Sequence, residues 1–534
     1  MTDRKVLFQF GYRRSPDQDS PSPARHPVIV AGAGPVGLCT AIDLAQRGVP
    51  VVLLDDADRI GEGSRGICYA KRTLEILDRL GVAEPCLEKG VTWKLGKVFQ
   101  RDELLYAFDL LPEDGHKMPA FINLQQYYLE HALVERAAQL PNLDIRWRNK
   151  VIAIERRDDG ATLTVETPEE SYDTEADWVV AADGARSSLR GMLGLAFQGE
   201  VFEDRFLIAD VKMQGDFPPE RWFWFDPPFH EGRSALLHKQ PDDVWRIDLQ
   251  LGSDADAKAE QTPERVIPRL RQMLGHDDFS LEWVSVYTFQ CRHLERFVHG
   301  RVIFAGDAAH QVSPFGARGA NSGIQDAENL AWKLALVVKG EAPESLLTTY
   351  DLERSAAADE NIGHSTRSTD FIAPRSAQEL RFRDATLSLA RHAPFAKRMV
   401  NSGRLSMPST YESPLSTPDA DTWSGSARLG APLPDAPMRD RDGKPIWLLE
   451  ALGNEETLLH MPNGEPPPAG STVIVIGRDL IDEMGLFAQR FDARPGSTYL
   501  VRPDHHLAAR WRHATPARIA KASRRLRGFE GEQA

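Results

Sequence analysis

The sequence has few cysteines and no long apolar run. Its 534 residues contain four cysteines, Cys39, Cys68, Cys86 and Cys291, and no two of them form a CxxC pair. This spacing fits neither a zinc site nor a disulfide framework, and it predicts a reducing, cytoplasmic setting. No apolar run reaches the roughly 18 residues that cross a bilayer. We therefore expect no membrane partner.

Basic residues are in deficit as well. The chain has 64 Lys and Arg against 78 Asp and Glu, a net charge of −14. Because nucleic acids recruit proteins chiefly through positive charge, we expect no nucleic-acid partner. There is no GxSxG or similar nucleophile motif, so covalent hydrolase chemistry has no support. No cluster of metal-ligand residues is visible, and we expect no metal.

What is present predicts an α/β chain of several domains. Alternating apolar and polar residues between 200 and 290 indicate a half-buried antiparallel sheet. Around it, buried strands alternate with helices. We divide the chain into an irregular arm (1–26) whose Phe8, Phe10 and Tyr12 dock on the protein surface, an α/β part (27–199 and 291–400), an inserted sheet (200–290), a linker (401–429) and a small C-terminal domain (430–534).

Hydrophobic periodicity places the individual elements. In the C-terminal domain, Thr515-Pro516 opens a basic helix with a good N-cap. Strands are predicted at 28–30, 51–54, 143–167, 177–182, 206–211, 222–225, 235–238, 244–249, 301–305, 473–476 and 499–501, and helices at 72–80, 122–139, 324–338 and over most of 341–400.

Gly32-Ala33-Gly34-Pro35-Val36-Gly37 is a GxGxxG motif that follows a predicted strand and opens a helix. In that context the first glycine makes the tight turn, the second admits a pyrophosphate, and the third packs helix on strand. Asp55 ends the next strand, where an acid binds a ribose hydroxyl. The alternative is an ordinary strand–helix turn, and the motif alone does not separate FAD from NAD.

A second segment, 306–334, also combines a strand end, a glycine-rich turn and a helix. Gly306-Asp307 ends a predicted strand, and a turn with Gly316, Gly319 and Gly323 leads into a long helix. The positive end of a helix dipole favours an anionic or electron-rich partner. Asp307 stands where it can accept hydrogen bonds from hydroxyl groups.

A third motif, Asp183-Gly184-Ala185-Arg186-Ser187, follows the strand predicted at 177–182. GxGxxG, DGAxS and GDAAH in this order resemble the single-component FAD-dependent aromatic hydroxylases (class A flavoprotein monooxygenases) over residues 27–400. Within them the chain looks closest to the 3-(3-hydroxyphenyl)propionate hydroxylase-like and phenol hydroxylase branch. The resemblance implies a glutathione-reductase-like Rossmann FAD domain, an inserted substrate sheet and a C-terminal thioredoxin-like domain. No cysteine follows Cys291, so that last domain carries no dithiol chemistry.

The resemblance also assigns cofactor residues, and it leaves a structural role for His310 in the GDAAH turn. Implied for non-covalent FAD are Gly32, Gly34, Pro35 and Gly37 on the pyrophosphate, Asp55 on the ribose, Arg65 and Gln126 beside the cofactor, Gly306 and Asp307 on the ribityl chain, the amides of Gly319, Ala320 and Asn321 at the flavin N1 and O2 edge, Pro314 beside the isoalloxazine ring, and Asp183 and Arg186 for both FAD and NAD(P)H.

The chemistry implied is aromatic hydroxylation in aromatic catabolism. NADH or NADPH reduces the FAD, O2 adds at C4a, and the flavin C4a-hydroperoxide transfers oxygen to an electron-rich ring, with a base or relay at the phenol. The substrate is expected between the flavin and the inserted sheet. Candidate lining residues are Trp222 and Trp224, with core packing as the alternative, His238 as a relay, and Arg246 for a substrate carboxylate or else in a surface ion pair.

Three other functions stay open at this point. One is a polyketide- or antibiotic-tailoring monooxygenase, including Baeyer–Villiger or epoxidation chemistry. Another is an O2-independent flavin reductase on the same fold. A third, a non-enzymatic binding module, is disfavoured by the complete set of cofactor motifs. The sequence does not settle the substrate, the nicotinamide preference or the oligomeric state, for which a homodimer is one alternative.

Overall fold

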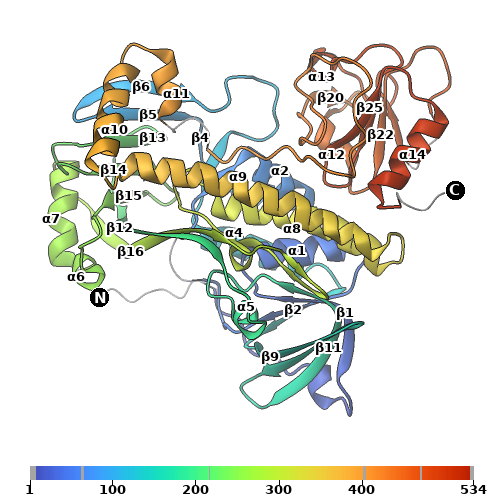
Figure 1. Ribbon diagram of the computed structural model, residues 1–534, viewed down its shortest axis with the longest axis horizontal. Coiled ribbons are helices and arrows are strands. Elements are labelled where there is room, and N and C mark those ends of the chain that lie inside the picture. The colour runs from blue at the N-terminus through green and yellow to red at the C-terminus, as the bar shows by residue number, and fades with distance from the viewer. Residues whose placement is uncertain (1–7, 62–64, 216, 401–404, 469–471, 530–534) are drawn as a thin grey trace.

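A computed structural model gives the fold and describes residues 8–61, 65–215, 217–400, 405–468 and 472–529 (Figure 1). Two large sheets and a C-terminal domain make up the molecule. The first sheet has the order β17-β18-β11-β1-β2-β8, with β10 paired to β11 and β9 paired to β10. Its strands are β1 (Ala24–Ala31), β2 (Val51–Asp55), β8 (Leu143–Trp147), β9 (Lys150–Arg157), β10 (Gly160–Glu166), β11 (Ser171–Ala181), β17 (Val298–His299) and β18 (Val302–Phe304).

The centre of this sheet is parallel, with β18, β11, β1, β2 and β8 side by side. Helices α1 (Pro35–Gln46) and α8 (Gly319–Val338) pack closely on each other. Glycine is needed there because a Cβ on Gly323 would lie 2.6 Å from Val36 Cγ2, and one on Gly306 would lie 2.8 Å from the same atom. This close approach places the segment that begins at Gly306 against the GxGxxG turn.

The second sheet has the order β19-β16-β12-β15-β14-β13-β5-β6. It takes strands from outside 200–290, which corrects that boundary, because β5 and β6 come from the part of the chain that we assigned to the α/β domain. Its strands are β5 (Leu95–Gln100), β6 (Glu103–Asp109), β12 (Gln198–Lys212), β13 (Arg221–Phe225), β14 (Ser234–Lys239), β15 (Val244–Gln250), β16 (Ser280–His293) and β19 (His310–Gln311).

The two faces of the second sheet have different neighbours. On one face Trp222, Trp224 and Trp245 pack with Val266 and Leu270 of the amphipathic helix α7 (Pro263–Leu274). On the other face, Phe223 and Phe225 pack with Phe315 and with residues of α9 (Thr348–Ile372) and α10 (Ala377–Ala390). Strand alternation sends successive residues of β13 to opposite faces. The sequence RWFWF therefore provides aromatic residues to both faces of the sheet.

The C-terminal domain is built on a sheet of order β23-β22-β24-β25, in which β22 and β23 are parallel and the other pairs antiparallel. Its elements are β22 (Thr457–His460), β23 (Val473–Val475), α13 (Leu486–Phe491), β24 (Thr498–Val501), β25 (Leu507–Trp511) and α14 (Pro516–Leu526). The described part of the predicted linker is not a free connection. Tyr411 stacks on His506 at 4.7 Å, and Asp419 pairs with Arg510 at 2.6 Å.

Several other boundaries differ from the prediction. The helix expected at 122–139 is preceded by strand β7 (Phe121–Asn123) and begins only at Gln126, as α4 (Gln126–Ala137). The arm ends earlier than residue 26, because β1 starts at Ala24. Within the arm, Phe8 stacks on His131 and Phe10 on Trp147, with ring centroids 3.8 and 4.5 Å apart. Both rings thus dock on the α/β part, as expected.

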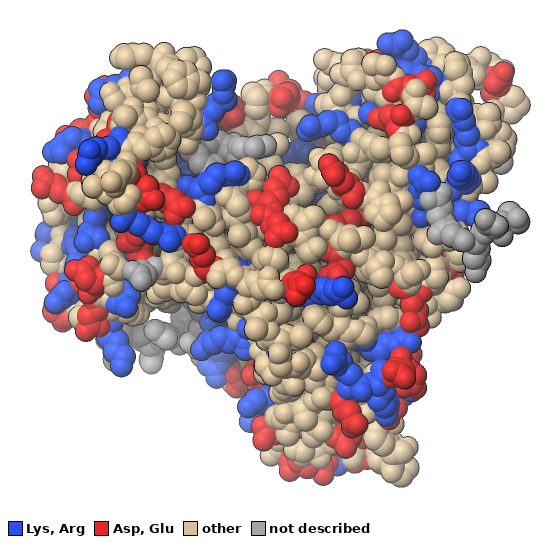
Figure 2. All heavy atoms as spheres, viewed as in Figure 1, with Lys and Arg blue, Asp and Glu red and all other residues tan. Residues whose placement is uncertain are grey.

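Acidic and basic side chains are interspersed over the face drawn in Figure 2, which is hollowed along its upper edge between the α10 lobe and the C-terminal domain. Within the described ranges, none of the helices combines the length and apolarity that a membrane span requires. The same ranges hold no group of three or more His, Cys, Asp or Glu suited to a metal ion.

Candidate cofactor and substrate site

The GxGxxG turn joins β1 to α1. Gly32 has φ +105°, and a Cβ there would lie 2.5 Å from the Ala182 carbonyl oxygen. A Cβ on Gly37 would lie 1.9 Å from the Gly32 oxygen, so α1 can approach the sheet only with glycine at this position. Gly34 differs, since a Cβ there would meet no atom within 4 Å. It caps α1 in front of Pro35, which leaves open space at the positive end of the helix.

Carboxyl groups gather beside this turn. Asp55 accepts hydrogen bonds from the amides of Ala33 (2.5 Å) and Ala57 (2.9 Å), and burial raises its pKa. Glu130, which the sequence analysis did not single out, accepts from Gln126 Nε2 (2.7 Å) and the Gly61 amide (3.1 Å). Burial raises the pKa of Glu130 to about 7 in spite of these donors. The only sequence signal for it is its place one helical turn after Gln126.

The Gly306-Asp307 segment has a buried support and an exposed acid. Gly306 has φ +62°, and its amide donates to Asp326 Oδ2 at 2.9 Å. His310 Nε2 lies 2.6 Å from the same oxygen, and Arg354 Nε lies 2.5 Å from Asp326 Oδ1. His310 is therefore held in a buried ion-pair cluster, in line with the structural role expected for it. Asp307 itself is exposed.

Helix α8 begins beside that acid. The amides of Gly319, Ala320 and Asn321 lie in its first turn, and they have no hydrogen-bond partner among the described residues, as expected at a helix start. The Asn321 side chain has a separate task. It bonds the backbone of Cys68 and Ala70 at 2.8 Å each, which fixes the loop after Arg65 to the helix.

Four of the remaining predicted residues are less well defined. Asp183 Oδ2 accepts from the Leu189 amide at 3.1 Å, while its Oδ1 is buried without a partner in the described structure. Arg186 and Arg65 are exposed. Pro314 is exposed as well, and its carbonyl accepts from the Ala317 amide at 3.0 Å. Their roles toward a cofactor stay predictions.

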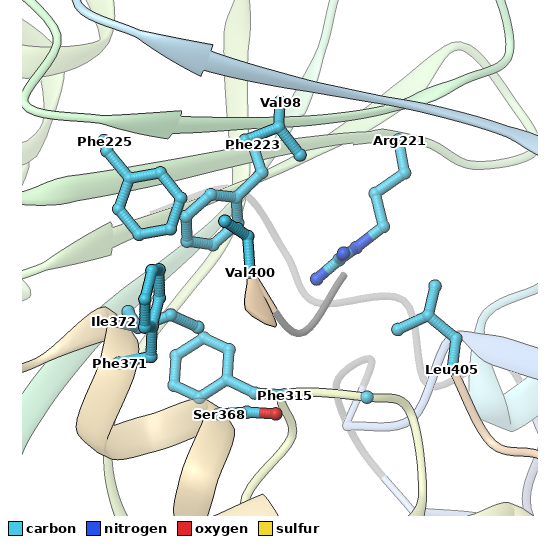
Figure 3. Close-up of a pocket in the computed structure, with 11 residues that line it drawn as sticks. Val98, Arg221, Phe223, Phe225, Phe315, Ser368, Phe371, Ile372, Val400 and Leu405 are labelled. Atoms are coloured by element: carbon cyan, nitrogen blue, oxygen red, sulfur yellow. The ribbon is translucent and has the colours of Figure 1, made fainter. Parts of the chain in front are cut away.

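A pocket of about 400 Å³ of empty space, part of it open to solvent, lies between the second sheet and the loop that leads into α8 (Figure 3). Phe315 and Gly316, directly after Pro314, form one wall. The pocket therefore adjoins the segments predicted to hold the flavin. Its lining comprises Val98 of β5; Arg221, Phe223 and Phe225 of β13; Phe315 and Gly316 of the loop; Ser368, Phe371 and Ile372 of α9; and Val400 and Leu405.

Two substrate predictions were wrong. Trp222 and Trp224 do share one strand face, with centroids 5.8 Å apart, but this face packs on α7 and turns away from the pocket. Arg246 is neither on the surface nor free for a substrate carboxylate. It is buried, and its Nε and Nη2 bond the two oxygens of Asp210 at 2.8 and 3.0 Å.

His238 lies on the pocket side of the sheet. It pairs across strands with Arg246, and its ring contacts Trp93 edge-on at 6.0 Å. Burial, reinforced by Arg221 and Arg246, lowers the pKa of His238 well below its usual value. Its Nδ1 is buried and has no hydrogen-bond partner among the described residues. The ring is therefore neutral near pH 7, while His238 itself does not line the pocket.

Together the fold and these groups define a dinucleotide-binding α/β protein whose second sheet closes a pocket beside the cofactor segments. Comparison with known proteins makes the class specific. The model of the FAD binding domain family matches residues 25–365, and the chain belongs to this family. The residues present fit FAD, since Gly34 faces open space, Asp307 is exposed and the first amides of α8 are unpaired.

Three similar proteins are named as a flavin-dependent monooxygenase or as hydroxylases. The chain is 34% identical to a flavin-dependent monooxygenase of Mycobacteroides abscessus over 363 residues, which are 64% of this chain and 73% of that protein. It is 27% identical to a 3-(3-hydroxy-phenyl)propionate/3-hydroxycinnamic acid hydroxylase of Mycolicibacterium smegmatis over 91% of both chains. The solved anhydrotetracycline hydroxylase from Streptomyces rimosus is similar with a TM-score of 0.73 and 28% identity, over 94% of this chain and 99% of that one. This chain is an FAD-dependent monooxygenase.

Proposed function

We propose that this monooxygenase hydroxylates an electron-rich aromatic substrate, a phenol or an aromatic acid, with NADH or NADPH and O2 as co-substrates. The observation that carries the proposal is the pocket. Four phenylalanines, Phe223, Phe225, Phe315 and Phe371, line a space that ends at the loop holding Pro314. Aromatic side chains favour an aromatic ligand through offset or edge-on ring contacts.

In this proposal FAD lies along the segments described above. The unpaired α8 amides would face the electron-rich edge of the flavin, where a helix start stabilises negative charge. Asp307 would accept from ribityl hydroxyls, and Asp55 from the ribose. The further contacts proposed are Gly32, Gly34, Pro35, Gly37, Arg65, Gln126, Asp183, Arg186, Gly306, Gly319, Ala320 and Asn321.

Bound FAD would supply the redox chemistry, in which NADH or NADPH reduces it and O2 is activated. The chain supplies orientation, a dry pocket and proton handling. Neutral His238 is suited to accept the proton of a substrate hydroxyl, which makes the ring more electron-rich at the moment it is attacked. Pro314 is proposed to form the boundary between flavin and substrate, because its neighbour Phe315 lines the pocket.

A second candidate is the tailoring of a larger polycyclic substrate. The solved relative that acts on anhydrotetracycline carries this alternative, and the apolar lining of the pocket does not oppose it. Phenolic acids, simple phenols and polycyclic phenols can be compared in one screen for stimulated NADH and NADPH oxidation, with identification of the product. Stimulation by none of them, in protein with a full complement of FAD, would remove the proposal.

We also propose that the C-terminal domain is thioredoxin-like and structural. Its strand order, with one parallel and two antiparallel pairs followed by a helix, supports the first part. Its lack of cysteine supports the second. Trp332 of α8 packs in one hydrophobic cluster with Leu458, Leu500 and Ile519 of this domain, so we expect that the domain stiffens the helix whose first turn faces the flavin.

A further inference from the structure

Arg221 is the one arginine that lines the pocket. It begins β13, and only 8% of its surface is exposed. Figure 3 shows its side chain reaching from the strand into the pocket, on the far side from Phe225 and Phe371. A guanidinium in such a place is costly, since burial removes water from a permanent charge. Here burial lowers the pKa of Arg221.

Nothing in the described structure compensates that charge. No carboxylate oxygen of the described residues lies within 4.0 Å of its nitrogens, and its guanidinium carbon lies 5.8 Å from the centre of the Phe223 ring. The neighbouring buried arginine of the sheet, Arg246, shows what compensation looks like, because both oxygens of Asp210 bond it. The same face thus carries one paired and one unpaired cation.

Asp248 is the acid that acts on Arg221 electrostatically, and it neutralises the charge only in part. Burial raises the pKa of Asp248 to about 7 in spite of Arg246 and Arg221, and its Oδ1 has no hydrogen-bond partner among the described residues. His238, on the same face, is neutral. The polar groups around Arg221 therefore leave a net positive site at one end of an otherwise aromatic pocket.

We propose that Arg221 binds a carboxylate on the aromatic substrate, so that the enzyme selects aromatic acids over neutral aromatics of the same size. A carboxylate fits because the planar guanidinium offers it two parallel hydrogen bonds. The ring then lies among Phe223, Phe225, Phe315 and Phe371, at the other end of the pocket. This inference rests on the proposed function and narrows its substrate class.

The test is ligand binding to the oxidised holoenzyme, followed by the change in flavin absorbance. The probes are 3-(3-hydroxyphenyl)propionate, 4-hydroxybenzoate and 6-hydroxy-2-naphthoate, each paired with its primary amide, which keeps shape and loses charge. We expect the best acid to bind at least about 30-fold more tightly than its amide, since an unpaired buried charge is relieved by one and not by the other.

Arg221→Met removes the cation and should abolish that preference, while Arg221→Lys should keep part of it. Arg265→Gln is the matched control, because Arg265 is 55% exposed on α7, which covers the opposite face of the sheet. Flavin content and circular dichroism establish that each variant is folded. Equal affinity for acid and amide in the unchanged enzyme would overturn the proposal, as would an intact preference in folded Arg221→Met.

The neutral probes separate this inference from the function beneath it. Hydroxylation of neutral phenols with no preference for acids would remove the role of Arg221 and leave aromatic hydroxylation standing. An absence of any flavin response and of any stimulated NAD(P)H oxidation, with acids and amides alike, would remove both.

Discussion

Two groups of buried charge in this molecule differ in one respect, which is whether the charges are paired. At the C-terminal domain, Glu353 of α9 receives Arg502 Nη1 and Nη2 at 2.8 and 2.9 Å and Lys333 Nζ at 2.8 Å. Arg502 also bonds both oxygens of Asp504, and all four side chains are fully buried. In the substrate sheet, Arg221 is buried almost as deeply and has no such partner among the residues that the structure describes.

The paired charges stabilise the structure, whereas the unpaired charge is suited to binding a ligand. Burial alone would raise the pKa of Glu353. Arg502 and Lys333 outweigh burial and hold this pKa well below its usual range. Trp332 Nε1 donates to Asp504 at 3.0 Å, so the interface network reaches α8. A paired network of this kind fixes the position of two domains, since removal of one partner strands the others. A buried unpaired charge lowers the stability of the fold, and it is retained where a bound ligand supplies the opposite charge.

The largest effect is expected at the paired network. Glu353→Ala leaves Lys333 and Arg502 buried without their carboxylate, which should lower the free energy of unfolding by about 3–5 kcal/mol. Thermal and denaturant unfolding of the FAD-bound enzyme measures it. The matched control is Glu360→Ala on the same helix, since Glu360 is 49% exposed and should change the stability by less than about 0.5 kcal/mol. Similar losses in both variants would contradict the account.

Glu130 is an intermediate case, a buried carboxyl held by neutral donors only. Because burial raises its pKa to about 7, the folded protein keeps this proton more tightly than the unfolded chain does. Stability therefore falls as the pH rises from the unfolded pKa through the folded one, roughly 4.5 to 7. Glu130→Gln should remove that loss and gain about 3 kcal/mol on the parent enzyme between pH 4.5 and 8.

The measurement for Glu130 is the stability of both proteins across this pH range. Glu135→Gln serves as the control on α4, since Glu135 is 64% exposed. Parallel pH profiles for the parent enzyme and Glu130→Gln would show that Glu130 ionises freely, and would place it with the exposed acids of the surface.

Asp307 is an exposed acid that no described residue pairs, and the account assigns it to FAD. Asp307→Ala should weaken FAD affinity by about 10- to 100-fold through loss of charge-assisted hydrogen bonds. The fold should survive, because no described residue bonds this carboxylate. Flavin retained after dialysis and the far-UV circular dichroism are the two readouts. Full flavin retention in the variant would remove Asp307 from the site.

The smallest effect has the opposite sign to the first. Arg221→Met removes an unpaired buried charge and keeps an apolar side chain of similar length, so it should raise the ligand-free stability by about 1 kcal/mol. Unfolding without aromatic ligand measures it. A clear loss of stability would mean that Arg221 is paired in the folded enzyme, and the contrast between the two regions would disappear.

The cofactor segments and the substrate sheet differ in how far the sequence predicts them. The GxGxxG turn, Asp55 and the Gly306-Asp307 segment predicted both the first sheet and the family, because glycine is needed where the backbone turns or helices approach closely. Gly32, Gly37 and Gly323 each lack room for a Cβ. Gly37 is limited by Gly32 nearby in the chain, whereas Gly32 and Gly323 are limited by Ala182 and Val36, which are distant in sequence. The spacing of the glycines that permit these close approaches is nevertheless visible in a single sequence.

The substrate face could not be predicted in the same way. Strand alternation puts Trp222 and Trp224 on one side and Arg221, Phe223 and Phe225 on the other, but it does not say which side a helix covers. The pairing of Arg246 with Asp210 joins two strands 36 residues apart, and β5 enters the sheet from residues 95–100. These are long-range contacts, and only the cation inside an apolar strand marked Arg221 in the sequence.

The central claim is that this FAD monooxygenase inserts one oxygen atom from O2 into an aromatic acid. The most direct measurement incubates the holoenzyme with NADH or NADPH, isotopically labelled O2 and the aromatic acid that perturbs the flavin most strongly, and identifies the product by mass spectrometry. The account predicts a hydroxylated acid that carries one labelled oxygen, formed in proportion to nicotinamide oxidised. Nicotinamide oxidation that consumes no O2, or a product without the label, would contradict it.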